Sequence, residues 1–298
     1  MSRLDWIAVD WGTTHLRAWG MGAGGVVFQT RGDQGMAQVR PGGFEEALLA
    51  LVGDWIAHPT PVVACGMVGA RQGWVETPYR CVPCAPVTAL TQAPTQDARL
   101  RVFVTAGVQQ TNPADVMRGE ETQIAGLVAE RETLSGVVCL PGTHSKWVQM
   151  EAGEIFHFAT FLTGELFALL ASASVLRHGI ADDGADMQAF LEAVDTALGT
   201  PERVAAKLFG LRAEGLISGL DPVTARARLS GLLIGLELAG AKPYWLGQEV
   251  TLVGDGALID LYSAALGQLG LVPNRRSGEA AVLAGLAAAN RSLMDTAR

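Results

Sequence analysis

The feature that most constrains this chain is a short turn close to its start, Asp10-Trp11-Gly12-Thr13-Thr14. An apolar run comes directly before the turn, and a second apolar run begins almost at once after it. Short runs around a glycine-containing turn predict a β-hairpin. A glycine there lets backbone N–H groups approach an anion closely, and threonine hydroxyls supply further donors. The pattern is typical of a phosphate-binding hairpin, although an ordinary hairpin would also explain it.

Asp10 is expected at the mouth of this turn. Mg²⁺ keeps most of its waters in proteins and takes few carboxylates. A single carboxylate at this position can hold the hydration shell of such a cation. We therefore predict that Asp10 is the metal-contacting residue.

The composition of the chain argues against several classes of protein. With 298 residues and 49% apolar content, the chain can bury a large core, as one large domain or two ordinary ones. A net charge of −8, with no cluster of Lys or Arg, argues against nucleic-acid binding. No apolar stretch approaches the ~20 residues of a membrane span, and no charged-then-apolar leader is visible. We expect a cytoplasmic protein with no nucleic-acid or membrane partner; a homo-oligomer is left open.

The four cysteines, Cys65, Cys81, Cys84 and Cys139, fit that compartment. Cys81 and Cys84 have the Cys-x-x-Cys spacing of redox and zinc sites, but no second pair of cysteines or histidines accompanies them. We therefore expect reduced, structural thiols.

A second glycine pattern matches the motif of a different nucleotide-binding fold. Gly20, Gly22 and Gly25 satisfy the Gly-x-Gly-x-x-Gly fingerprint of dinucleotide-binding domains. That fingerprint requires a helix directly afterwards, whereas a β-branched run over 26–29 follows here. The glycines are therefore predicted in a loose hairpin loop that leads into a third strand.

A helix over 43–57 and a buried strand over 61–65 are predicted next, which makes the order β-β-β-α-β. The strand opens into a glycine-rich loop, Gly66-Met67-Val68-Gly69-Ala70-Arg71-Gln72-Gly73-Trp74. In open α/β sheets, ligands bind at the carboxyl ends of strands. Arg71 could pair with a carboxylate or phosphate there, or simply lie on the surface. An irregular segment over 75–96 and a strand over 101–104 follow.

The next candidate segment is centred on Asp115. Pro113 among polar residues is typical of a helix entry, so a helix is predicted to start near Asp115 and to continue over 124–130. A carboxylate at a helix start can be a plain N-cap, because the helix dipole favours its charge. Asp115 therefore has a structural explanation beside any catalytic one.

The pattern of the N-terminus recurs in the middle of the chain. A strand over 137–140, a Gly/Thr turn over 141–145, and strands over 146–150 and 155–158 form a second predicted meander. The chain is then expected to be mainly helical, over 165–177, 186–198, 202–212 and 224–241.

One further glycine turn comes late in the chain. A predicted strand over 249–253 runs into Gly254-Asp255-Gly256, and a helix is expected from about Ala257. Backbone amides point outward at such a helix start, which suits a nucleotide. A closing helix is predicted over 278–290.

Three glycine turns in this order resemble the layout of the actin, Hsp70 and sugar-kinase superfamily. The resemblance implies an α/β, two-domain actin-like ATPase (ribonuclease H-like) fold with an ATP cleft between the domains. The implied domains are an N-terminal one over 1–112 and a C-terminal one over 113–298, whose last helix can pack back on the N-terminal domain.

Several segments together resemble the 2-dehydro-3-deoxygalactonokinase family more closely. They are Asp10-Trp11-Gly12-Thr13-Thr14, the loop over 66–74, Pro113-Ala114-Asp115-Val116-Met117-Arg118-Gly119-Glu120-Glu121-Thr122-Gln123, Pro141-Gly142-Thr143-His144-Ser145-Lys146-Trp147 and Thr163-Gly164-Glu165-Leu166. The resemblance implies a kinase that phosphorylates the 6-hydroxyl of 2-dehydro-3-deoxy-D-galactonate with ATP, in bacterial galactonate breakdown. Ala70 departs from the pattern, since a serine is expected there, and the lost hydroxyl could alter substrate contacts.

The resemblance also implies where ATP binds. Mg²⁺ would bridge the β- and γ-phosphates and contact Asp10 through water. His144 and Lys146 could add positive charge, although a hairpin histidine can also satisfy backbone carbonyls. The implied ATP-binding residues are Asp10, Gly12, Thr13, Thr14, Gly142, Thr143, His144, Lys146, Gly254, Asp255 and Gly256.

The implied catalytic base is Asp115, because hexokinase-type relatives keep their base just before the second phosphate hairpin. Glu120 and Glu121 are the alternatives, since they lie further along the same predicted helix. Such a carboxylate would accept the proton of the substrate hydroxyl while the phosphates are positioned for transfer.

The implied partner is a small-molecule sugar acid, whose carboxylate needs a cation that neutral sugars do not. Arg71 is the expected partner of that carboxylate, with Arg118 as the alternative. Gly69 and Glu120 are placed in the same substrate site.

Two other functions fit the same residues. A non-kinase ATP-dependent switch or scaffold would share the phosphate turns but would not use a sugar-acid pocket around Arg71 and Asp115. The other is a kinase of a different sugar or sugar acid. Which C4 epimer is preferred depends on contacts in or near residues 75–96.

Overall fold

The structure is a computed structural model that describes residues 3–87 and 89–296. Contacts within the chain divide it into two compact units. Unit 1 is drawn from Met1–Ser135, Met150–His157 and Ser277–Arg298, and unit 2 from Gly136–Gln149 and Phe158–Arg276. Over the described ranges, no helix combines the length and the apolar character that a membrane span needs.

This contact-based division differs from the expected boundary at 112–113. Residues 113–135 are grouped with unit 1, as is the last helix, α9 (Gly278–Thr296). The boundary between 1–112 and 113–298 is expected from the two-domain layout of the superfamily, and it stays a prediction.

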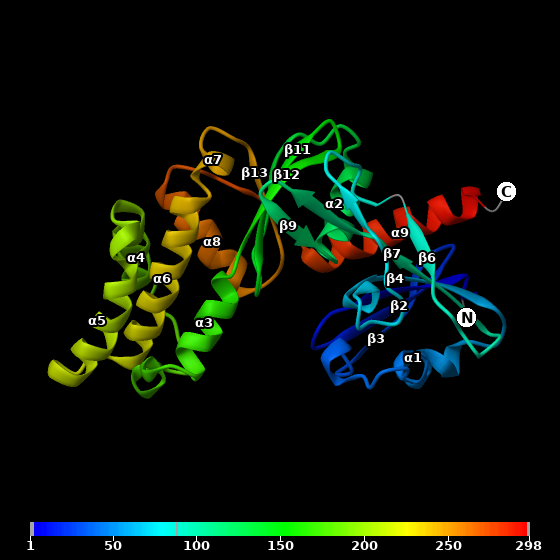
Figure 1. The fold of residues 1–298 in the computed structure, drawn as a ribbon, viewed down its shortest axis with the longest axis horizontal. Helices are drawn as coiled ribbons and strands as arrows, with labels where there is room; N and C mark the ends of the chain where they lie inside the picture. The colour runs from blue at the N-terminus through cyan, green and yellow to red at the C-terminus, as the bar shows by residue number, and fades with distance from the viewer. Residues whose placement is uncertain (1–2, 88, 297–298) are drawn as a thin grey trace. The chain divides into compact units, whose positions relative to one another are not determined.

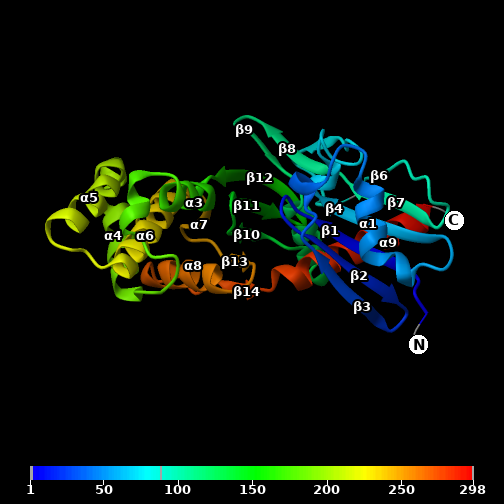
Figure 2. The ribbon, with the colours of Figure 1, turned by 90° about the horizontal axis from the view of Figure 1, so that it is seen from below.

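Unit 1 contains a six-stranded sheet with the strand order β3-β2-β1-β4-β7-β6. Its strands are β1 (Trp6–Trp11), β2 (Leu16–Gly22), β3 (Gly25–Gly32), β4 (Thr60–Gly66), β6 (Leu90–Gln92) and β7 (Leu100–Thr105). β1 pairs antiparallel with β2, and β2 with β3, which confirms the predicted meander; Figure 2 shows these blue strands side by side. β4 runs parallel to both β1 and β7.

The expected loop at the glycine-rich segment is shorter than predicted. Gly20 and Gly22 belong to β2, and Gly25 begins β3. A Cβ at position 20 would fall on the ring of Phe28 across the hairpin. Gly20 therefore makes room for cross-strand packing, and no dinucleotide-binding helix follows it.

Alternating side chains of β1 enter two different cores. Ile7, Val9 and Trp11 join a buried cluster with α1 (Phe44–Val52), whereas Ala8 joins a second cluster with residues of α9. A parallel sheet is normally covered on both faces in this way.

Helix α2 (Glu120–Glu130) packs closely on α9, as Figure 1 shows for the green and red helices. A Cβ at Gly126 would fall on the carbonyl oxygen of Ala281, and one at Gly285 on that of Thr122. These two glycines therefore let the helix backbones approach each other.

The segment around Asp115 forms a hairpin, so the predicted helix entry there is wrong. A third sheet consists of β5 (Tyr79–Cys81), β8 (Gly107–Thr111) and β9 (Ala114–Met117). Pro113 lies in the tight turn between β8 and β9, which pair antiparallel. The helix begins only at Glu120, after Gly119 at a φ of 113°. Proline suits a turn as well as a first helical turn, and the strand pairing decides between them.

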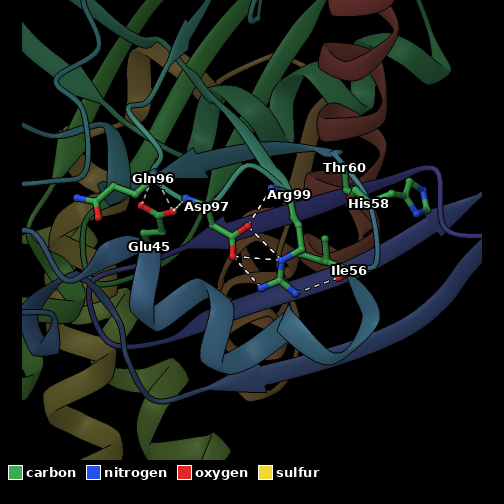
Figure 3. A network of polar contacts seen from close by, with 7 residues as sticks. All are labelled: Glu45, Ile56, His58, Thr60, Gln96, Asp97 and Arg99. Carbon is green, nitrogen blue, oxygen red and sulfur yellow. Dashed lines mark hydrogen bonds and ion pairs between the residues drawn. The ribbon is translucent and has the colours of Figure 1, made fainter.

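A polar network joins α1 to the loop before β7 (Figure 3). The carboxylate of Glu45 accepts hydrogen bonds from the backbone N–H groups of Gln96, at 3.0 and 2.9 Å, and Asp97, at 2.6 Å. Arg99 Nη2 donates to Asp97 Oδ2 at 2.7 Å, and its Nη1 donates to the carbonyl of Ile56 at 3.2 Å. Hydrogen bonds from Arg99 lower the pKa of Asp97 to about 2.

A five-stranded sheet with the order β12-β11-β10-β13-β14 lies mainly in unit 2, although residues 150–157, which include parts of β11 and β12, are grouped with unit 1. Its strands are β10 (Gly136–Leu140), β11 (Ser145–Glu151), β12 (Glu154–Phe161), β13 (Val250–Val253) and β14 (Asn274–Arg276). The predicted strands of the second meander are confirmed, and β10 runs parallel to β13. The short β14 was not expected.

Six α-helices of unit 2 are α3 (Thr163–Ser172), α4 (Met187–Gly199), α5 (Val204–Ile217), α6 (Pro222–Gly240), α7 (Lys242–Trp245) and α8 (Ala257–Gln268). Asp186 caps α4 by accepting from Ala189 N, and Asp221 caps α6 directly before Pro222. α8 begins at Ala257, as predicted. The α/β class with two related sheets is confirmed.

Candidate active site

The turn after β1 is held by main-chain hydrogen bonds. Gly12 N donates to His15 O at 2.9 Å, and the carbonyls of Gly12, Thr13 and Thr14 accept from residues 35–37 at 3.0 to 3.1 Å. A Cβ at Gly35 would fall on the backbone of Thr14. Because the carbonyls already accept hydrogen bonds from residues 35–37, the exposed side chains of Thr13 and Thr14 remain to contact a ligand.

One carboxylate oxygen of Asp10 forms a short ion pair, and the other has only a long contact with a thiol. Arg17 Nη2 lies 2.5 Å from Asp10 Oδ2, and Arg17 Nη1 also lies 3.6 Å from Glu279. Cys65 Sγ is 3.7 Å from Asp10 Oδ1. The described residues form no group of three or more acidic, His or Cys side chains that could hold a metal ion. A lone carboxylate with one oxygen available fits a hydrated Mg²⁺ better than a fully protein-ligated ion.

The ends of β1 and β4 meet the start of α2. Gly66 has a φ of 89°, and a Cβ on it would lie 2.7 Å from Trp11 O. A Cβ on Gly119 would lie 3.4 Å from Gly66 Cα. The strand ends that carry Asp10 and the first turn of α2 therefore lie side by side.

Glu121 is a buried acid at this junction, with an exposed fraction of 0%. Its Oε2 accepts from Gly119 N at 2.6 Å, and its Oε1 from Thr122 Oγ1 at 3.1 Å. Burial, and then the charge of Glu120, raise the pKa of Glu121 to about 8. In this arrangement the carboxyl is mostly protonated at neutral pH and has no surface to offer a substrate.

The remaining candidate bases differ in position. Asp115 lies on β9, opposite Gln110, and its Oδ1 lies 2.7 Å from the N–H of Val116. Glu120 is the first residue of α2 and is partly exposed, and its Oε2 accepts from Arg118 N at 3.1 Å. Of the two, Glu120 is therefore the one that lies beside the strand ends carrying Asp10.

The predicted substrate residues fall into a packed group and an exposed one. Arg118 donates to the side chain of Thr77 and, at 3.0 Å, to its carbonyl, and its guanidinium lies 4.3 Å from the ring centroid of Tyr79. A Cβ at Gly69 would lie 2.8 Å from Thr77 Oγ1, so Gly69 belongs to the same group. The side chain of Arg71 is 81% exposed, 3.7 Å from Glu76. Sequence reasoning missed Thr77 and Tyr79, which lie in the segment expected to be irregular.

The turn after β10 is held from the start of α3. Glu165 N donates to Thr143 O at 2.9 Å, and a Cβ at Gly164 would fall on Gly142 O. His144 Nε2 lies 2.6 Å from Glu165 Oε2, so this histidine pairs with a carboxylate. The Thr163-Gly164-Glu165 segment singled out from the sequence is thus part of the turn's support.

Lys146 lies on β11, with an exposed fraction of 4%. Gly254 and Gly256 have φ values of 150° and 73°, and Gly256 is the N-cap of α8. Asp255 lies between them and is exposed.

A cavity of about 600 Å³ opens beside the second turn, within unit 2. Gly142 and Thr143 line one side, and Ala257 and Leu258 at the start of α8 line another. Phe190 of α4 adds an apolar wall. The cavity therefore reaches the first helical residues after the Gly254–Gly256 turn, and its size and walls suit a nucleoside.

The chain is similar to known proteins over nearly its whole length. The family model described as 2-keto-3-deoxy-galactonokinase matches residues 10–289. A protein of Escherichia coli (strain K12) named 2-dehydro-3-deoxygalactonokinase is 33% identical, over 94% of this chain and 96% of that protein. A Rhizobium meliloti (strain 1021) protein named probable 2-dehydro-3-deoxygalactonokinase is 40% identical, over 96% of both. A crystal structure of a Sinorhizobium meliloti protein assigned to the same activity is 40% identical, with a TM-score of 0.89 over 97% of this chain and 99% of that one.

Proposed function

Because this chain belongs to the 2-keto-3-deoxy-galactonokinase family, we propose that it transfers a phosphoryl group from ATP to the 6-hydroxyl of 2-dehydro-3-deoxy-D-galactonate. The observation that carries the proposal is the full-length similarity to the Escherichia coli protein of that name, which leaves no large segment unmatched. Two supported Gly/Thr turns, one in each unit, agree with it. The product would enter galactonate breakdown in the cytoplasm.

ATP is proposed to bind through both turns. Gly12, Thr13 and Thr14 of unit 1 and Gly142 and Thr143 of unit 2 would contact the phosphates, and the threonine hydroxyls would donate to the phosphate oxygens. The nucleoside would occupy the cavity in front of α8, next to Gly254, Asp255 and Gly256. His144 and Lys146 are proposed to add positive charge near the phosphates.

Mg²⁺ is proposed to lie near Oδ1 of Asp10, the oxygen that Arg17 does not hold, with water between them. Bound there, the ion would neutralise charge on the β- and γ-phosphates. Arg17 holds the other oxygen of Asp10 and so fixes the direction in which the carboxylate faces.

The sugar acid is proposed to bind in unit 1. Arg71 is exposed and unconstrained enough to reach a carboxylate, whereas Arg118 is engaged with Thr77 and would orient the site together with Gly69. For the base, Asp115 is the candidate from the resemblance, and Glu120 is the candidate that the position of α2 favours. Either would accept the proton of the 6-hydroxyl.

A coupled assay of ADP release tests the function. The purified protein receives ATP and Mg²⁺ with 2-dehydro-3-deoxygalactonate, its gluconate epimer, a neutral hexose or no sugar. Turnover on the galactonate compound is expected. Slow ATP hydrolysis that ignores every sugar acid would instead indicate the ATP-dependent switch, and turnover on another sugar would change the substrate.

Matched variants then identify the base. Asp115→Asn and Glu120→Gln are compared for kcat and for ATP binding. The variant that loses kcat by about 100-fold or more while it still binds ATP identifies the base.

A further inference from the structure

Helix α6 carries a buried carboxylate in its middle, Glu237, with an exposed fraction of 2%. Trp147 Nε1 donates to its Oε1 at 2.8 Å, and the hydroxyl of Tyr262 donates to its Oε2 at 2.6 Å. Thr163 also forms a hydrogen bond to this carboxyl. Burial raises the pKa of Glu237, and these hydrogen bonds oppose that rise.

A chain of hydrogen bonds continues from Glu237 to the second turn. The hydroxyl oxygens of Tyr262 and Ser145 are 2.9 Å apart, and Gly142 N lies 3.5 Å from Ser145 Oγ. Tyr262 gives its only hydroxyl proton to Glu237. Ser145 accepts from Gly142 and gives its own proton to Tyr262 or directly to Glu237, with which it also forms a side-chain hydrogen bond. All donors in this relay therefore face towards the carboxylate, and each bond polarises the next.

Glu237 also reaches the other side of the turn. Thr163 is the first residue of α3, and the N–H of Glu165 in the same helix holds the carbonyl of Thr143. One buried carboxylate thus connects both supports of the turn, the Ser145 side and the α3 side. Tyr262 and Thr163 line the cavity as well, so the same group shapes its wall.

Packing alone does not require a charge at this position. Burying a carboxylate is costly, and replacing a buried ionic group by apolar residues of similar volume often leaves stability unchanged or higher. A group that accepts hydrogen bonds from several elements at once specifies one arrangement of those elements.

We propose that Glu237 is a positioning residue for ATP, which holds the Gly142–Ser145 turn and the α8 wall of the cavity in their binding arrangement through Tyr262, Ser145 and Thr163. This inference rests on the proposed binding of ATP phosphates to that turn.

Three variants test it through direct titration with a fluorescent ATP analogue and through steady-state kinetics. Glu237→Gln keeps the volume but replaces one acceptor by a donor, and we expect Kd and KM for ATP to rise about tenfold, as loss of a charge-assisted hydrogen bond predicts. Tyr262→Phe keeps the ring and removes one donor to Glu237, and Ser145→Ala removes the hydroxyl that joins the turn to both Tyr262 and Glu237; a rise of about three- to tenfold is expected for each. The KM for the sugar acid should change less than about twofold, because this bonding network does not touch the proposed substrate residues.

The control is Trp245→Phe. Trp245 lies in the same core cluster, and its Nε1 donates to Leu238 O at 2.8 Å, so this variant removes one buried indole bond without touching Glu237. We expect a lower melting temperature and an unchanged ATP affinity. A rise of Kd in proportion to lost stability in all variants, the control included, would overturn the inference.

A double variant and a variant of the turn itself separate the remaining outcomes. If Glu237→Gln does not fold, the double variant Tyr262→Phe/Ser145→Ala replaces it: non-additive effects on Kd support the relay, and additive effects contradict it. Thr143→Ala tests the turn itself. If Thr143→Ala weakens ATP binding and the relay variants do not, the inference alone is wrong; if none of them does, the proposed ATP placement is wrong too.

Discussion

Each of the two Gly/Thr turns follows a strand and leads into a returning strand, but their supports differ. In unit 1, backbone N–H groups of residues 35–37 hold the carbonyls of the turn, and its acid, Asp10, is partly exposed and paired with Arg17. In unit 2, one main-chain bond, from Glu165 N to Thr143 O, is joined by side chains that converge on the buried Glu237. A turn supported by main chain tolerates changes of side chain except where space is lacking, whereas one supported by side chains depends on a few polar groups.

The largest effect is expected at the carboxylate that faces the proposed metal. Asp10→Asn should lower kcat about 1,000-fold and raise the Mg²⁺ concentration needed for half-maximal rate, because the charge that orients the hydrated ion is lost. Removal of Mg²⁺ with EDTA should abolish turnover in the wild type. Glu237→Gln is the matched variant in unit 2 and should leave the Mg²⁺ dependence unchanged. Equal Mg²⁺ curves for Asp10→Asn and the wild type would remove Asp10 from the metal site.

A steric change should break the main-chain support of the first turn. In Gly35→Ala the new Cβ would meet the backbone of Thr14, which cannot move aside as a flexible side chain could. We expect kcat/KM to fall about 100-fold, the usual result of a displacement of about 1 Å in a catalytic site. Gly24→Ala is the control, because a Cβ there meets nothing within 4 Å. Unchanged kinetics in Gly35→Ala would show that the first turn can adapt to the added Cβ, and would contradict the claim that its main-chain support is sterically rigid.

The buried acid of unit 1 should make stability depend on pH. The pKa of Glu121 is about 8 in the fold and 4.5 for an unperturbed glutamate, so between these pH values the folded state binds more protons than the unfolded one. Its contribution to the free energy of unfolding is full below about pH 4.5 and is lost as pH rises towards 8. Glu121→Gln mimics the neutral acid and should remove this decline. Urea unfolding of both proteins at pH 5, 6.5 and 8 measures it, and parallel pH profiles would contradict the assignment.

The smallest effect is expected away from both turns, at Asp97. Its pKa of about 2 means that its contribution to stability is present above pH 4 and is lost as pH falls through about 2. The ion pair with Arg99 is partly exposed, so Asp97→Asn should lower the melting temperature at pH 7 by less than about 4 °C and leave kcat unchanged. A thermal scan and the coupled assay check this. A loss of activity would mean that the network in Figure 3 supports the first turn.

Local patterns in the sequence determined most of the elements. Alternation along β1 separates Ile7 and Val9 from Ala8, and the structure sends them to different cores. The β-branched run after Gly25 was enough to exclude a dinucleotide-binding helix, and β3 is found there. Such features depend on neighbours along the chain, so a sequence alone carries them.

Only the tertiary structure decided the partners of these elements. Pro113 could open a helix or close a hairpin, and the pairing of β8 with β9 selects the hairpin and moves the helix start from Asp115 to Glu120. In the sequence, Glu237 is a single acid within an apolar stretch that is predicted to be a helix. Its partners Trp147 and Tyr262 lie 90 and 25 residues away along the chain, and burial, which depends on such distant contacts, is what gives this carboxylate its role.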